Sequence, residues 1–193
     1  MPKQFLSFLR EVAPFDEIVQ SDLLCKLKII HVPKGKILLS EGEVCDKLWF
    51  IKTGLARGCY IVQRETGRDD EVTEWFAKEN DFFHAFESFV NEVPSSEFIE
   101  TLEPCTLVYI TRSDLYQLYA KHPDACNLGR ILAERYGLLH KEKLREMRLH
   151  SAGERLETFH RQSKDLFLRI PQKYIASYLG ISENYVSKLK ARP

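Results

Sequence analysis

Residues 183–192 carry amide, carboxylate, hydroxyl and amine side chains at the spacing of a helix. An amide can pair with an adenine edge, a carboxylate can accept from cytosine, and an amine can reach guanine or a phosphate. The candidates for base contact are Glu183, Asn184, Ser187 and Lys188. Phosphate contacts position a protein on a duplex without reading its sequence. The candidates for that role are Gln172, Lys173, Ser182, Lys190 and Arg192.

The flanking residues predict two short helices that would position these groups. Pro171 is expected at the first helical position, where a missing N–H costs nothing. Gly180 marks a sharp turn, and Ser182 is a natural cap for a second helix. The apolar positions that would hold the helices together are Ile175, Ala176, Leu179, Val186 and Leu189. This ordered set is more demanding than a plain amphipathic helical hairpin, so it favours a DNA-binding helix-turn-helix.

The charge distribution agrees with this interpretation. The formal net charge is zero, but residues 1–140 carry 16 Lys and Arg against 22 Asp and Glu, whereas residues 141–193 carry 12 against six. Phosphate binding depends on such local fields rather than on the whole-chain sum. A basic surface that serves only solubility is the alternative explanation. The sequence therefore predicts an acidic body that ends in a basic region.

Other classes of protein find little support in the sequence. The five cysteines lie far apart without a C-x-x-C pair, so we interpret them as small apolar residues rather than metal ligands and expect no metal site. No glycine-rich phosphate loop, nucleophile elbow or His/Glu metal pattern indicates an enzyme, and we expect no catalytic residues. No apolar run has the length of a signal peptide or a membrane span, so we expect a cytoplasmic protein without membrane contact.

The pattern of apolar residues and turn signals along the chain predicts an α+β fold in three parts. Short helices are expected up to about residue 26, and many short strands separated by turn signals between residues 28 and 111. A long helix is expected from Pro123 to about residue 150, and a capping box at Ser151 and Glu154 restarts a helix. The predicted domains are a β-barrel sensor domain (1–122), a connecting and dimerisation helix (123–150) and a helix-turn-helix domain without an obvious wing (151–193).

In this order, the segments resemble the Crp/Fnr family of bacterial transcription regulators. The residues that carry the resemblance are KGKIL (34–38), EGE (41–43), LWFIKTG (48–54) and PQKYIASYLGIS (171–182). The resemblance covers nearly the whole chain. It implies N-terminal helices, an antiparallel jelly-roll barrel of the cyclic-nucleotide-binding type, a long dimerisation helix and a C-terminal helix-turn-helix.

The resemblance also exposes a departure. Family members that bind cyclic AMP carry a phosphate-binding cassette that begins Gly-Glu and ends near Arg-Ser or Arg-Thr; here these positions fall on His84-Ala85 and Ser95-Ser96. A buried phosphodiester needs a basic partner or helix N–H groups. Residues 82–102 contain no Lys or Arg and four Glu. We therefore expect no cyclic AMP or cyclic GMP binding of the usual kind, and no cofactor.

Two interpretations of this altered segment remain open. In one, Phe82, Phe83, Phe86 and Phe89 fill the pocket as core, and the domain is structural. In the other, a cavity takes an unknown uncharged or cationic small-molecule effector, and a histidine makes the response sensitive to pH. The candidate pocket residues are His84, Ala85, Phe86, Glu87, Ser88, Ser95 and Ser96.

The resemblance further implies a homodimer on double-stranded, pseudo-palindromic DNA, with RNA polymerase as a candidate partner. The predicted dimer contacts on the long helix are Leu128, Ile131, Leu132, Tyr136 and Leu139. The alternative is a degenerate ligand-binding or protein-interaction module without specific DNA binding. Whether the chain elutes as a dimer and shifts duplex DNA separates the two.

Overall fold

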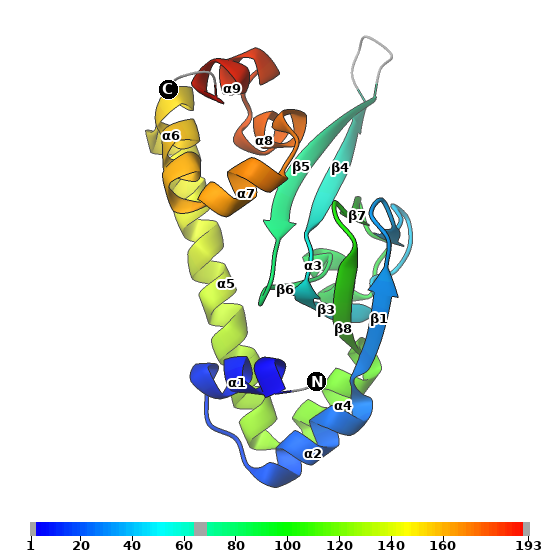
Figure 1. Cartoon of the computed structure of the whole chain (residues 1–193). Coiled ribbons are helices and arrows are strands. Elements are labelled where there is room, and N and C mark those ends of the chain that lie inside the picture. The colour runs from blue at the N-terminus through cyan, green and yellow to red at the C-terminus, as the bar shows by residue number, and fades with distance from the viewer. Residues whose placement is uncertain (1–2, 64–68, 191–193) are drawn as a thin grey trace. The chain divides into compact units, whose positions relative to one another are not determined.

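A computed structural model describes residues 3–63 and 69–190 (Figure 1). Internal contacts divide the chain into two compact units. The first consists of residues 1–58 and 76–136, and the second of residues 59–75 and 137–193. Helix α5 (Pro123–Leu149) and the strand pair β4 (Ala56–Gln63) and β5 (Asp69–Ala77) therefore contribute residues to both units.

The described strands form two four-stranded sheets. One has the order β1-β8-β3-β6 and the other β2-β7-β4-β5. The first contains β1 (Lys28–Val32), β8 (Cys105–Thr111), β3 (Lys47–Thr53) and β6 (Phe82–Phe83). The second contains β2 (Ile37–Leu39), β7 (Glu97–Thr101), β4 and β5. The predicted strands are confirmed, whereas β6 was not predicted because it has only two residues.

Strand β3 lacks the alternation of a strand that faces water on one side. Trp49, Phe50 and Ile51 are all buried, so both faces of this strand are covered. The ring of Phe5 in helix α1 (Lys3–Val12) lies 4.9 Å from that of Phe50, edge to face, while Trp49 stacks on Phe83. The N-terminal helices α1 and α2 (Glu17–Lys26) thus complete the core of the first unit.

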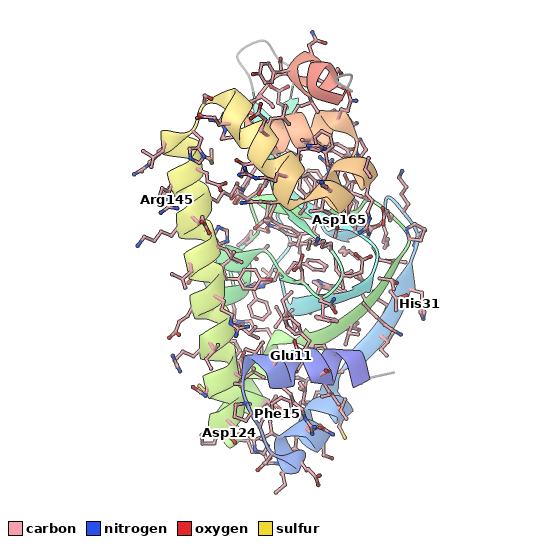
Figure 2. The ribbon with its side chains drawn as sticks, turned by 60° about the vertical axis from the view of Figure 1, so that its left-hand side comes forward. Glu11, Phe15, His31, Asp124, Arg145 and Asp165 are labelled. Carbon is pink, nitrogen blue, oxygen red and sulfur yellow. The ribbon has the colours of Figure 1, made fainter. Side chains whose placement is uncertain are left out.

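The remaining helices follow the sequence closely. Helix α3 (Phe86–Asn91) lies in the altered cassette, and α4 (Arg112–Lys121) leads to α5, which begins at Pro123 as predicted. Figure 2 shows Asp124 in the first turn of α5 and Arg145 nearer its other end. Asp124 in the first turn and Arg148 in the last turn interact favourably with the helix dipole.

The C-terminal helices belong to the second unit. They are α6 (Ala152–Gln162), α7 (Lys164–Arg169), α8 (Gln172–Leu179) and α9 (Glu183–Lys190). The predicted capping box is present, since Ser151 and Glu154 satisfy each other's backbone N–H groups at the start of α6. Across the part of the chain that is described, no helix has the length and apolar character to cross a membrane.

Candidate functional site

Helices α8 and α9 form a hairpin around Gly180, which we call the reading hairpin (172–190). Gly180 has a φ of 63°, a left-handed conformation that a residue without Cβ adopts readily, and its N–H bonds back to α8. Ile175, Ala176 and Leu179 are buried on α8, and Val186 is fully buried on α9. The turn and the apolar face are as predicted. Pro171 is not the first helical residue but the N-cap, one position earlier.

The polar side chains lie on the opposite face of the hairpin. Ser182, Glu183, Asn184, Ser187 and Lys173 are exposed, and Gln172 is half-buried. The Ser187 hydroxyl donates to Gln172 Oε1 at 2.6 Å, so a group from each helix meets at this surface. The side chains of Lys188, Leu189 and Lys190, and all of Arg192, lie outside the described residues.

Helix α6 contacts both helices of the reading hairpin. Arg155 donates through Nε and Nη2 to the carbonyl oxygen of Leu179, at 3.3 and 3.1 Å. A guanidinium here satisfies a carbonyl at the C-terminus of α8 and favours the negative end of its dipole. A Cβ at Gly153 would lie 2.9 Å from the hydroxyl of Tyr185, so this side chain of α9 reaches toward α6. These contacts fix the start of α9 relative to α6.

In the altered cassette, the two buried serines are committed to the backbone. Ser88 donates to the carbonyl of Val93 and accepts from the N–H of Cys45. Ser95 donates to the carbonyl of Glu97 and accepts from the N–H of the same residue. Because both hydroxyls are engaged in shaping the loop, neither offers a ready partner to a ligand.

Aromatic packing in the cassette differs from the prediction at one residue. Phe83 and Phe89 are buried and Phe82 is half-buried, but Phe86 is 62% exposed, so its assignment to the core was wrong. The reason is helical geometry: α3 begins at Phe86, and its inner positions are Ser88 and Phe89. Glu87 and Ser96 are also exposed, while Ala85 is buried.

His84 lies half-buried among these rings, 4.7 Å from the ring of Phe89 and 5.7 Å from that of Phe86, between centroids. Desolvation lowers its pKa from 6.5 to about 4. The imidazole is therefore neutral near neutral pH, which argues against the pH-sensitive response that the second interpretation allowed.

Acid should destabilise the fold through His84. The unfolded state takes up a proton near pH 6.5, but the folded state does so only near pH 4, so the free energy of unfolding falls as pH drops through this window. The variant His84→Gln should lose less stability than the wild type between pH 7 and pH 4.5, as measured by urea unfolding. Parallel losses in the two proteins would contradict the assignment.

Sequence reasoning missed a buried charge beside the cassette. Arg57 on β4 is 1% exposed, and its Nε and Nη2 lie 2.6 and 2.5 Å from Oε1 of Glu100 on the neighbouring strand β7. Its guanidinium also lies 5.8 Å from the ring centroid of Phe98. The signal was present as one charged residue within an otherwise apolar and small run, residues 55–59. Glu100 therefore supplies the counter-charge for this buried guanidinium.

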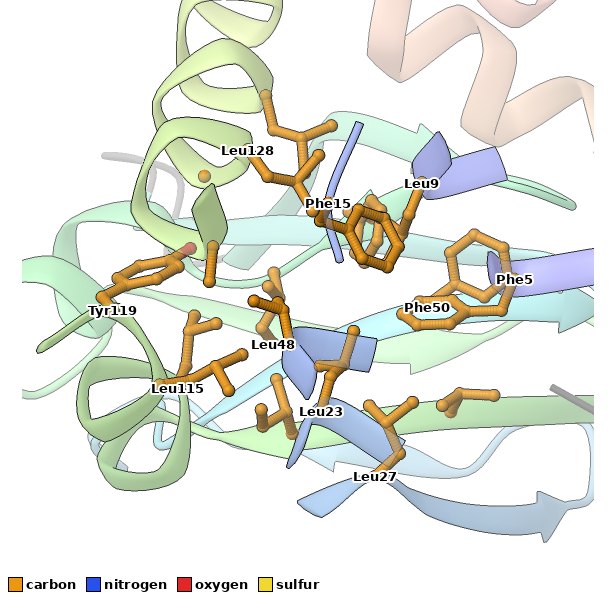
Figure 3. Close-up of a pocket in the computed structure, with 18 of the residues that line it drawn as sticks. Phe5, Leu9, Phe15, Leu23, Leu27, Leu48, Phe50, Leu115, Tyr119 and Leu128 are labelled. Atoms are coloured by element: carbon orange, nitrogen blue, oxygen red, sulfur yellow. The ribbon is translucent and has the colours of Figure 1, made fainter. Parts of the chain in front are cut away.

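Part of the predicted dimer stripe on α5 contacts its own domain. Leu128 and Leu132 line a small apolar cavity of about 50 Å³ together with residues of α1, α2 and α4 (Figure 3). This volume is far below the roughly 300 Å³ of a typical ligand pocket. The Tyr136 hydroxyl donates to the carbonyl of Phe82. Ile131 is half-buried. Leu139, by contrast, is 61% exposed, as is its neighbour Leu138 at 67%.

Comparisons with known proteins agree with this architecture. Residues 29–122 match the family described as the cyclic nucleotide-binding domain. FixK2 from Bradyrhizobium japonicum is similar in structure, with a TM-score of 0.69, 18% identity, and 86% of this chain and 83% of that one covered. The regulator CLP of Xanthomonas campestris, described as responsive to c-di-GMP, gives a TM-score of 0.66 at 18% identity, with 91% of this chain and 92% of that one covered. The catabolite activator protein of Thermus thermophilus gives a TM-score of 0.56 at 18% identity, with 95% of this chain and 84% of that one covered. No curated protein matches the sequence.

Residues 29–122 are therefore similar to cyclic nucleotide-binding domains. With the helices that follow them, these residues share the fold of FixK2, CLP and the catabolite activator protein, which confirms the fold that the resemblance of residues 34–54 and 171–182 implied.

Proposed function

We propose that this protein is a transcription regulator that binds DNA through the reading hairpin, with α9 in the major groove. The observation that carries the proposal is the hairpin itself: Glu183, Asn184 and Ser187 are exposed on a helix whose inner residue, Val186, is fully buried. The left-handed turn at Gly180 and the Crp/Fnr layout support the same role.

The hairpin divides into two kinds of contact. Asn184 and Glu183 stand in the first turn of α9, the part of a recognition helix that reads base edges, together with Ser187 and Lys188 as further candidates. Lys173, Gln172 and Ser182 stand at the starts of the two helices, where backbone N–H groups also favour a phosphate.

These two roles predict different results for two alanine variants. Asn184→Ala should reduce discrimination at one base pair by about 1–3 kcal/mol, because one side-chain contact to a base edge is lost. Lys173→Ala should weaken binding to all duplexes alike and reduce the slope of log K against log salt by about one. Fluorescence anisotropy over a set of single-base operator variants and several salt concentrations measures both. Indistinguishable effects of the two changes would contradict the assignment.

We further propose that the protein acts as a homodimer through α5. The uncovered leucines Leu138 and Leu139, with Leu144 and Leu149 further along, support this role for the second half of the helix. A two-fold dimer presents two α9 helices to half-sites about 34 Å apart. Leu139→Glu should therefore shift the protein toward a monomer in analytical ultracentrifugation.

The barrel is proposed not to respond to cyclic AMP or cyclic GMP. The support is chemical: no Lys or Arg lies in residues 82–102, Ser95 is engaged by the backbone of Glu97, and Arg57 is paired with Glu100. A phosphodiester in this place would be desolvated without a compensating cation.

A further inference from the structure

The outer part of the β4–β5 strand pair contacts the reading hairpin within the second unit. The hydroxyl of Ser177 on α8 accepts from the N–H of Thr73 at 2.9 Å and donates to the carbonyl of Glu71 at 2.9 Å. β5 is the outermost strand of its sheet, so its backbone groups on that side need a partner from elsewhere. Ser177 provides one for two residues of the strand at once.

Lys143 of α5 reinforces the same contact. Its amine donates to the carbonyl of Glu74, lies 3.8 Å from the Oε1 atom of that residue, and sits 4.3 Å from the ring centroid of Tyr178, the neighbour of Ser177. Thr73 is 2% exposed, so its amide is shielded from water. We name this set of contacts, made by Ser177, Lys143 and residues 71–74, the clasp.

The clasp places acidic residues beside a surface assigned to DNA. Ser177 lies four residues after Lys173, so the two share a face of α8. The strand that contacts this face begins with Asp69, Asp70 and Glu71, all exposed. A duplex phosphate that approaches Lys173 would therefore meet the side of α8 that β5 contacts, and the acidic start of that strand would oppose it.

We propose that the clasp is an autoinhibitory contact, in which the acidic start of β5 holds α8 and opposes DNA binding. This inference rests on the proposed DNA-binding function. DNA would bind the open form, so the apparent dissociation constant exceeds the intrinsic one by the inverse of the open fraction. Any event that releases β5 from Ser177 would strengthen DNA binding without altering the residues that read bases.

The test combines one variant with two readouts on the full-length protein. Ser177→Ala removes both hydrogen bonds and places a strong helix former on α8. It should accelerate amide hydrogen exchange at Thr73, measured by NMR, and tighten binding to the best duplex from a random-sequence library about five- to thirtyfold, the range for the loss of one to two net hydrogen bonds. Ser21→Ala, at an exposed serine on helix α2 of the first unit, is the matched control and should change neither.

A second variant tests the charges. The triple change Asp69→Asn, Asp70→Asn and Glu71→Gln should tighten DNA binding more than the triple change Glu11→Gln, Glu17→Gln and Glu41→Gln. Both remove three negative charges from exposed positions, but only the first set lies on β5.

Three results would overturn the inference. Unchanged exchange at Thr73 in Ser177→Ala would show that the clasp does not hold the strand. Faster exchange with unchanged or weaker DNA binding would show that the clasp does not inhibit. Equal effects of the two triple changes would show that only the net charge of the protein matters and that the position of the acidic residues on β5 does not. Failure of the proposed function has its own signature, because then no duplex is selected by the wild type or by any variant.

Discussion

The variant Arg57→Ala is expected to lower the free energy of unfolding by about 3–5 kcal/mol, because it removes the cation that compensates the carboxylate of Glu100. Arg57 is 1% exposed, and its ion pair with Glu100 is 2.5 Å long, so water screens this pair only weakly. Urea unfolding followed by circular dichroism measures the loss.

The double variant Arg57→Met with Glu100→Leu separates the ion pair from the packing. Replacing both members of a buried pair by apolar residues of similar size is often neutral or stabilising. The double variant should therefore be much closer to the wild type than Arg57→Ala is. Glu87→Ala, at an exposed position of α3, is the control for loss of a single charge. If the double variant lost as much free energy of unfolding as Arg57→Ala, the uncompensated charge of Glu100 would not be the cause of the loss.

The variant Gly54→Ala should also destabilise the barrel strongly, by about 3 kcal/mol or more when strain and overpacking add. Gly54 has a φ of 109°, and a Cβ there would lie 2.5 Å from Sγ of Cys105 and 2.8 Å from the carbonyl oxygen of Pro104. The backbone atom cannot move aside as a flexible side chain would. Thermal and urea unfolding both report the effect.

Gly35→Ala provides the comparison. Gly35 has a φ of 76°, and a Cβ there would meet no atom within 4 Å. Alanine at this position therefore meets only the left-handed strain, about 1–2 kcal/mol. The difference between the two variants measures the close approach of the 104–105 backbone to Gly54. Equal costs for the two changes would show that the close approach carries no energy.

Much of the fold was predictable because its local signals agree with the tertiary structure. Pro123 marks the start of α5, Ser151 and Glu154 form the capping box, and Gly180 takes the left-handed turn. Phe86 was misassigned because hydrophobicity alone does not say which side of a six-residue helix faces the core. The loops on either side of such a short helix determine which of its faces points to the core.

The candidate site was predictable in its residue types but not in its surroundings. The exposed polar face of α9 follows from helical spacing, and Val186 is buried beneath it as expected. The clasp between Ser177 and Thr73 joins residues 104 positions apart, and no local pattern indicates such a contact. The pairing of Arg57 with Glu100 likewise depends on β4 and β7 being neighbours in the sheet.

The proposed regulator combines a DNA-reading hairpin with a barrel that lacks the usual nucleotide response. The most direct test is fluorescence anisotropy of the best duplex from a random-sequence library, titrated with full-length protein alone and with excess cyclic AMP or cyclic GMP. We expect selective binding, tighter than to a scrambled duplex by at least about 10³-fold, with the same affinity in all three conditions. Equal affinity for the scrambled duplex, or binding that requires either nucleotide, would contradict this combination.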